Sequence, residues 1–170
     1  LGSHLAGSAA FLWASAPAEE RVVDHNGALI RDDRPSTGIA LSNEGHVAWA
    51  SGWIGPDGTE GTTPGRPTAL HAWNGLLGVG MAHGPIAFAA GDQSWSRPKS
   101  NDEAGFSVSS GRMEDMQVWL VGAPASGHVY AIDTNSFTIL ADWSGNGRFG
   151  HAIAVADIDG DSVNDLIVGA

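Results

Sequence analysis

Short apolar runs separated by turn residues recur along the whole chain. The runs are rich in Val, Ile, Ala and Leu and are bounded by Gly, Pro, Asn or Asp. Runs of about four to eight residues with this composition and these boundaries are typical of β-strands. No long segment repeats apolar residues at the helical spacing of three and four. The pattern therefore predicts an all-β protein.

Two predicted hairpins stand out within this pattern. The runs RVVDH and ALIRD flank Asn26-Gly27, and residues 128–132 and 137–143 flank the turn DTNS. Asn-Gly is the strongest short hairpin signal, because both residues tolerate positive φ. In contrast, residues 55–67 and 94–105 are irregular and rich in Gly, Pro and charge, so we expect them to be exposed loops where a partner binds.

Near the C-terminus, Asp recurs on alternate positions between two strand-like runs. The segment from Asp157 to Asp165 reads DIDGDSVND and lies between HAIAVA and LIVGA. Such a density of carboxylates calls for a cation, and Ca²⁺ accepts six to eight oxygen ligands in flexible geometry. The expected ligands are Asp157, Asp159, Asp161 and Asp165, with the backbone carbonyl of Val163.

The familiar helix-flanked calcium loop does not fit this segment. That loop has Gly at its sixth position and a bidentate Glu at its twelfth, where this chain has Ser162 and Val168. The flanking runs suit strands, so the acidic loop is expected inside a β-hairpin. The alternative is a solvated acidic turn, since Asp and Gly are ordinary turn residues.

The whole phrase FGHAIAVADIDGDSVNDLIVGA resembles the FG-GAP repeat of integrin α-subunit β-propellers and of the propeller of a secreted phospholipase D. The matching residues are Phe149-Gly150 at its head, Asp157 to Asp161 in the loop, and Val168 to Ala170 at its tail. The resemblance implies a β-propeller with a calcium loop. Ser162 departs from the Gly common in the family, and at positive φ this would cost about 1 kcal/mol.

Weaker matches to this sequence pattern divide the chain into five repeats. The repeat heads are Leu1-Gly2, Thr37-Gly38, Leu77-Gly78, Phe106-Ser107 and Phe149-Gly150. Their spacing of about 30 to 45 residues suits propeller blades of about four strands each. We expect a single domain, 1–170, with repeats at 1–36, 37–76, 77–105, 106–148 and 149–170, which makes four blades and the start of a fifth in a piece of a larger propeller. Only the last repeat has the acidic loop, so one calcium site is expected.

The charge balance limits the classes of partner that the chain is expected to bind. The chain has 19 acidic and 8 basic residues, for a net charge of −11, and its cations are scattered. Binding to nucleic acid or to anionic lipid depends on clustered cations, so neither is expected. No apolar stretch is long enough to span a bilayer, and the absence of Cys leaves no disulfides to stabilise the fold.

Catalytic signals are lacking, and the expectation is that this chain is not an enzyme. The seven His are spread over the repeats, no Cys nucleophile exists, and no Ser stands in a GxSxG elbow. The seven Trp leave a carbohydrate-binding alternative open. Trp13, Trp49 and Trp119 fit core positions, whereas Trp53, Trp73, Trp95 and Trp143 lie nearer turns, where an exposed ring could stack on a sugar.

Together these features predict a calcium-binding interaction and adhesion module that is extracellular, secreted or at the cell surface, with a protein or glycan ligand. The alternatives are a non-catalytic propeller of a secreted hydrolase, similar to the phospholipase D relative, and a propeller lectin. The last repeat has only two inner strands, which would leave an open edge at residues 168–170. We expect a longer parent chain or self-association to complete that blade.

Overall fold

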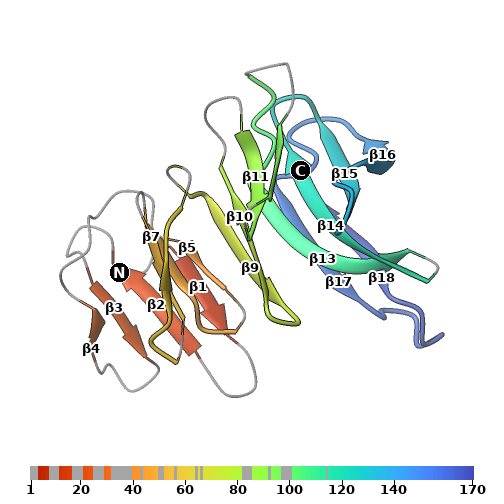
Figure 1. Cartoon of the computed structure of the whole chain (residues 1–170). Helices are drawn as coiled ribbons and strands as arrows, with labels where there is room; N and C mark the ends of the chain where they lie inside the picture. Colours follow the sequence, from red (N-terminus) through yellow and green to blue (C-terminus); the bar gives the residue numbers. More distant parts are fainter. Residues whose placement is uncertain are drawn as a thin grey trace. The chain divides into compact units, whose positions relative to one another are not determined.

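The computed structural model consists of antiparallel strands, which confirms the all-β prediction (Figure 1). It describes residues 4–7, 12–16, 21–24, 29–31, 40–42, 44–49, 52–55, 57–63, 65, 67–81, 86–91, 93–96, 101–113 and 115–170. Among these residues no helix is long and apolar enough to cross a membrane. The chain divides into two compact units, Leu1–Val79 and Gly80–Ala170. The predicted single domain stays a prediction.

The first unit contains two four-stranded sheets with strands in chain order. The first sheet has β1 (His4–Gly7), β2 (Leu12–Ala16), β3 (Arg21–Asp24) and β4 (Leu29–Arg31). The second sheet has β5 (Ala40–Leu41), β6 (Val47–Trp49), β7 (Gly52–Ile54) and β8 (Glu60–Gly61). The β3–β4 pairing confirms the predicted hairpin, although Asn26-Gly27 itself lies outside the described residues. Strand β8 interrupts the loop predicted at 55–67, while Asp57 to Thr59 are exposed as expected.

The third sheet differs from the predicted repeat boundaries. Its strands are β9 (Ala69–Trp73), β10 (Leu76–Gly80), β11 (Ile86–Ala90) and β12 (Gln93–Ser96). Leu77-Gly78 therefore lies within the second strand and not at the head of a repeat. The physical reason is the Asn74-Gly75 turn, in which φ is 50° and 78°, the conformation of a tight hairpin between β9 and β10.

Sheet four is the best-packed part of the second unit. Its strands, in order, are β13 (Ser107–Met113), β14 (Met116–Ala123), β15 (His128–Asp133) and β16 (Ile139–Ser144). Residues Val118 to Ala123 and Val129 to Ile132 are buried on both faces of the central strands. Trp119 is fully buried, which confirms its predicted core position. The β15–β16 pairing likewise confirms the hairpin predicted around DTNS.

The prediction of an exposed loop at 94–105 is wrong at its start and at its end, and residues 97–100 lie outside the described residues. Strand β12 occupies its start, and Trp95 is buried with its ring 5.4 Å from that of Tyr130. Asp102 and Ala104 are buried as well. The apolar contact area of an indole outweighs the polar character of its neighbours, which decides the position of this strand. Trp95 is consequently not available to stack on a sugar.

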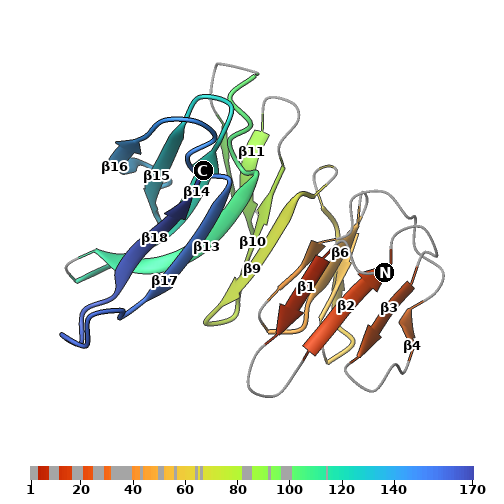
Figure 2. The ribbon, with the colours of Figure 1, turned by 180° about the vertical axis from the view of Figure 1, so that it is seen from behind.

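The last sheet has two strands, β17 (Ala152–Ala156) and β18 (Asp165–Gly169), and Figure 2 shows β17 beside β13. A close backbone contact joins it to sheet four. A Cβ atom on Gly122 would overlap the carbonyl oxygen of Gly150, and one on Gly150 would overlap that of His128. Ser107 Oγ donates to the Gly150 carbonyl at 2.7 Å. Glycine in the FG head and in the preceding VGAP segment thus permits one repeat to pack on the next.

Candidate metal centre

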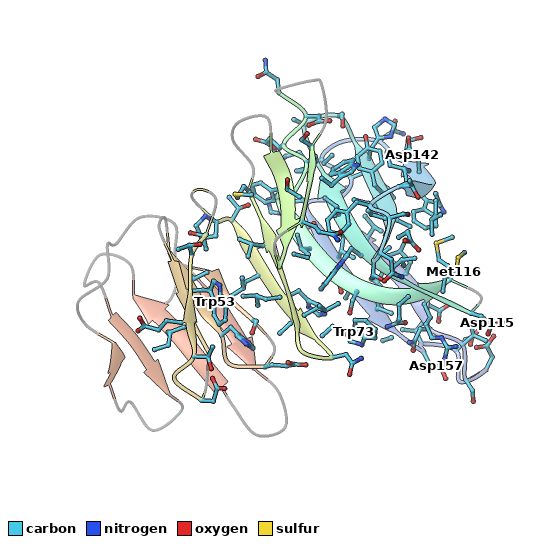
Figure 3. The ribbon with its side chains drawn as sticks, viewed as in Figure 1. Trp53, Trp73, Asp115, Met116, Asp142 and Asp157 are labelled. Carbon is cyan, nitrogen blue, oxygen red and sulfur yellow. The ribbon has the colours of Figure 1, made fainter. Side chains whose placement is uncertain are left out.

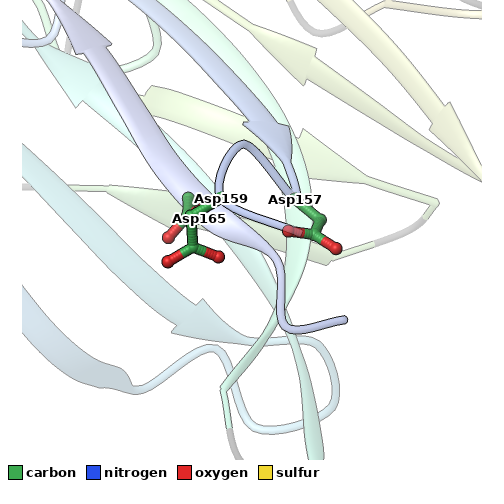
Figure 4. Close-up of side chains that lie close together, drawn as sticks. All are labelled: Asp157, Asp159 and Asp165. Atoms are coloured by element: carbon green, nitrogen blue, oxygen red, sulfur yellow. The ribbon is translucent and has the colours of Figure 1, made fainter. Parts of the chain in front are cut away.

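The acidic loop connects β17 to β18, and the register of this hairpin brings its two ends together. Ala156 pairs with Asp165, so Asp157 follows directly after one strand while Asp165 begins the other. One carboxylate oxygen each from Asp157, Asp159 and Asp165 lies within 4.8 Å of the others. Figure 4 shows Asp159 and Asp165 next to one another, with Asp157 across the loop. Three of the predicted ligands therefore converge.

Backbone amides hold all three of these carboxylates in place, and Asp159 Oδ1 accepts a hydrogen bond from the Asp161 amide at 3.1 Å. Asp157 accepts hydrogen bonds from the amides of Gly160 at 2.7 Å and Ser162 at 2.9 Å. Asp165 Oδ2 accepts one from the amide of Ile158 at 3.0 Å. The loop is thus folded around its own carboxylates, as short Asp-rich turns generally are.

Asp161 and Val163 lie differently from the other predicted ligands. The Asp161 carboxylate is outside the converging group, and its Oδ1 accepts a hydrogen bond from the Val163 amide at 2.7 Å. The side chain of Val163 is 64% exposed. The structure does not bring Asp161 together with the other three carboxylates, and a ligand role for either residue stays a prediction.

The backbone at Ser162 has a positive φ, as the Gly that is common at this position in FG-GAP repeats suggested. Its φ is 69°, and that of Gly160 is 81°. A Cβ atom in this region approaches the following carbonyl oxygen and costs about 1 kcal/mol or more. Ser162 is therefore a locally strained residue within the loop.

The chemistry of the converging group fits a hard divalent cation. All three side chains offer carboxylate oxygens, which are the ligands that Ca²⁺ prefers. Within the described part of the chain, no Lys, Arg or His forms an ion pair with any of them. Asp157 and Asp159 are exposed and Asp165 is half-buried, so the group is accessible from solvent.

A His–Asp pair outside the loop was not predicted from the sequence. His128 Nδ1 lies 2.6 Å from Asp142 Oδ1, and the imidazole stacks on Tyr130 with 5.7 Å between ring centroids. No sequence signal identifies it, because a register shift between Ala131 and Ile132 is what sets Asp142 opposite Tyr130 and diagonal to His128. The pair links strands β15 and β16. Among the described residues, no hydroxyl group is hydrogen-bonded to this imidazole as a nucleophile would be.

The antiparallel sheets, the FG-GAP match and the similar solved structures together indicate a fold of the β-propeller type. Residues 149–170 match the family model of the FG-GAP repeat, which confirms the resemblance inferred for that segment. No curated protein matches the chain.

Several solved structures are similar in fold, and two lyases are among them. One is selenomethionine-substituted virginiamycin B lyase from Staphylococcus aureus, with a TM-score of 0.64 and 17% identity over 88% of this chain and 58% of that one. The other is a streptogramin B lyase, with a TM-score of 0.63 and 12% identity over 84% of this chain and 54% of that one. This chain spans a little more than half of each lyase, and at these identities the likeness concerns the fold.

Proposed function

We propose that this chain is an extracellular or cell-surface interaction module that is stabilised by one Ca²⁺ in its FG-GAP repeat. The convergence of the Asp157, Asp159 and Asp165 carboxylates within 4.8 Å is the observation that carries the proposal. Three acidic groups at this separation repel one another in the absence of a cation, and a bound cation removes that repulsion. The cation would thus hold the β17–β18 hairpin together.

The proposed role is to bind a protein partner. The proposal does not include catalysis by the chain itself. Asp57 to Glu60 are exposed, and the chain has a net charge of −11, which favours a partner with a basic surface. In the described residues, the last sheet has two strands whereas each of the others has four. That difference supports the proposal that the chain represents four blades and part of a fifth, completed by a longer parent chain or a second copy.

Calcium-dependent melting tests the proposed site. Extracellular calcium modules bind with dissociation constants of about 10⁻⁴ to 10⁻³ M, so 2 mM Ca²⁺ should stabilise the fold by about 1 kcal/mol. For a chain of this size, that corresponds to a melting temperature about 2 to 4 °C higher than in chelator. Asp159→Asn should abolish the increment, and Mg²⁺ should not reproduce it.

Asp115→Asn is the matched control for this experiment. Asp115 lies at the tip of the β13–β14 hairpin, is exposed, and does not belong to the converging group (Figure 3). Its substitution removes one negative charge and should leave the Ca²⁺ increment unchanged. Identical melting of the wild-type chain in Ca²⁺ and in chelator would show that the site assignment is wrong.

A further inference from the structure

A pocket of about 160 Å³ lies in the second unit, between sheet four and the β17–β18 hairpin. Met113, Leu120 and Trp143 form its wall on sheet four, and Val155 and Leu166 form the wall on the hairpin. Leu120 belongs to the buried group of Val118, Leu120 and Ala131, and the other four side chains pack around that group. The pocket is therefore bounded on both sides by apolar surface from well-defined strands.

The size and lining of this pocket favour one ring as its ligand. An apolar cavity of about 150 Å³ in another protein is known to bind benzene. Aromatic rings pack favourably against an indole such as that of Trp143, and a thioether such as that of Met113 also attracts ring edges. Such contacts favour a planar ring over an aliphatic chain of equal volume.

The polar end of the pocket adds a requirement for a hydrogen-bond donor. Arg112, Asn164 and Asp165 are the polar residues that line the pocket, and the side chains of the last two offer oxygens as acceptors. The Arg112 guanidinium lies 3.7 Å from the Asp115 carboxylate, which offsets its attraction for an anion, and the Asp165 carboxylate repels one. A sugar would bury several hydroxyls against apolar walls. We propose that the pocket binds a compact neutral aromatic ring with one hydrogen-bond donor, a phenol or an indole.

The proposed pocket is a different site from the proposed calcium site, although Asp165 belongs to the converging carboxylates and also lines the pocket. The aromatic ring would contact side chains of β13, β14, β16 and β17, whose positions are set by strand pairing and not by the loop. Binding should therefore be measured both with 2 mM Ca²⁺ and with chelator. Binding that persists in chelator supports the pocket irrespective of the calcium result.

p-Cresol is a suitable first probe, with binding measured by calorimetry and by ligand-observed NMR. A ligand of this size is expected to bind with a dissociation constant of about 10⁻⁴ to 10⁻³ M. N-acetyl-tyrosinamide has the same ring attached to a peptide backbone. Binding of both probes would identify the ring as a side chain of a protein partner, and binding of p-cresol alone would identify a free small molecule.

Gly111→Val provides the blocking variant. A Cβ atom at Gly111 would lie 3.4 Å from Leu120 Cδ1 and 3.5 Å from Val155 Cγ2, which is ordinary contact distance, so the larger side chain narrows the pocket without a backbone clash. It should weaken p-cresol binding by about tenfold or more, since the ring loses its contacts on both walls. If Gly111→Val impairs folding, Gly111→Ala can be used in its place. It adds only a methyl group and should weaken p-cresol binding by a smaller factor.

Ile139→Val is the control, because Ile139 is 45% exposed and does not line the pocket. It should bind p-cresol as the wild-type chain does. Three results would overturn the inference: no saturable binding of p-cresol to the wild type, equal binding by the folded Gly111 variants, or tighter binding of methyl glucoside than of p-cresol. The last result would favour a carbohydrate ligand.

Discussion

Replacing Gly150 by Ala tests whether backbone contact between repeats holds the second unit together. Gly150 has φ of 91°, and an added Cβ atom would overlap the His128 carbonyl oxygen and lie 3.2 Å from the Ala123 nitrogen. Both of these are backbone atoms of sheet four, so no flexible side chain can move to relieve the overlap. Gly160 offers a matched comparison, because its φ is 81° and no heavy atom lies within 4 Å of the added Cβ.

The expected magnitudes follow from these two environments. Positive φ costs Ala about 1 to 2 kcal/mol, and the stiffer unfolded chain offsets about 0.4 to 1 kcal/mol of this at either position. Gly150→Ala adds about 1 to 3 kcal/mol for overlap. It also strains the hydrogen bond between Ser107 Oγ and the Gly150 carbonyl, worth about 1 kcal/mol. Gly150→Ala should thus destabilise the chain by about 3 kcal/mol more than Gly160→Ala.

Urea denaturation followed by Trp fluorescence measures this difference, since Trp119 and Trp143 both belong to sheet four. Chelator should be present in both samples, so that a cation in the acidic loop does not affect the comparison. A difference of about 3 kcal/mol corresponds to about 6 to 12 °C in melting temperature for a chain of this size. If the two variants unfold within about 1 kcal/mol of each other, the contact between repeats does not carry the stability assigned to it.

Ser162→Gly should raise the free energy of unfolding by about 0.5 to 1 kcal/mol in thermal melts, because it relieves the positive φ of 69°. Ser94→Gly, on the exposed face of β12, should instead lower it, and a stabilising effect there would contradict the reasoning. Burial lowers the pKa of His71 to about 4, from an ordinary 6.5. Because the unfolded chain then binds more protons between pH 6.5 and pH 4, stability should fall over this window as pH decreases, by up to about 3 kcal/mol. His71→Gln should flatten that part of the pH profile, and an unchanged profile would show that another group titrates.

The sequence alone was sufficient for features that depend on local chain geometry. Hairpins form where polar turn residues separate apolar runs, and the composition of DTNS was enough to predict the β15–β16 hairpin, although the positive φ of that turn lies at Phe137. The FG-GAP segment at 149–170 was recognised because its motif residues lie close together along the chain. The same local geometry explains the difference in the third sheet, because the Asn74-Gly75 turn places Leu77-Gly78 within its second strand, β10.

Only the tertiary structure decided which side chains lie close together across strands. It brought Asp157, Asp159 and Asp165 together while leaving Asp161 outside, because the β17–β18 register sets the two ends of the loop opposite each other. It also buried Trp95 in a segment whose composition suggested a loop. Spacing along a chain limits where a side chain can lie, but packing between sheets and the pairing of strands determine what it contacts.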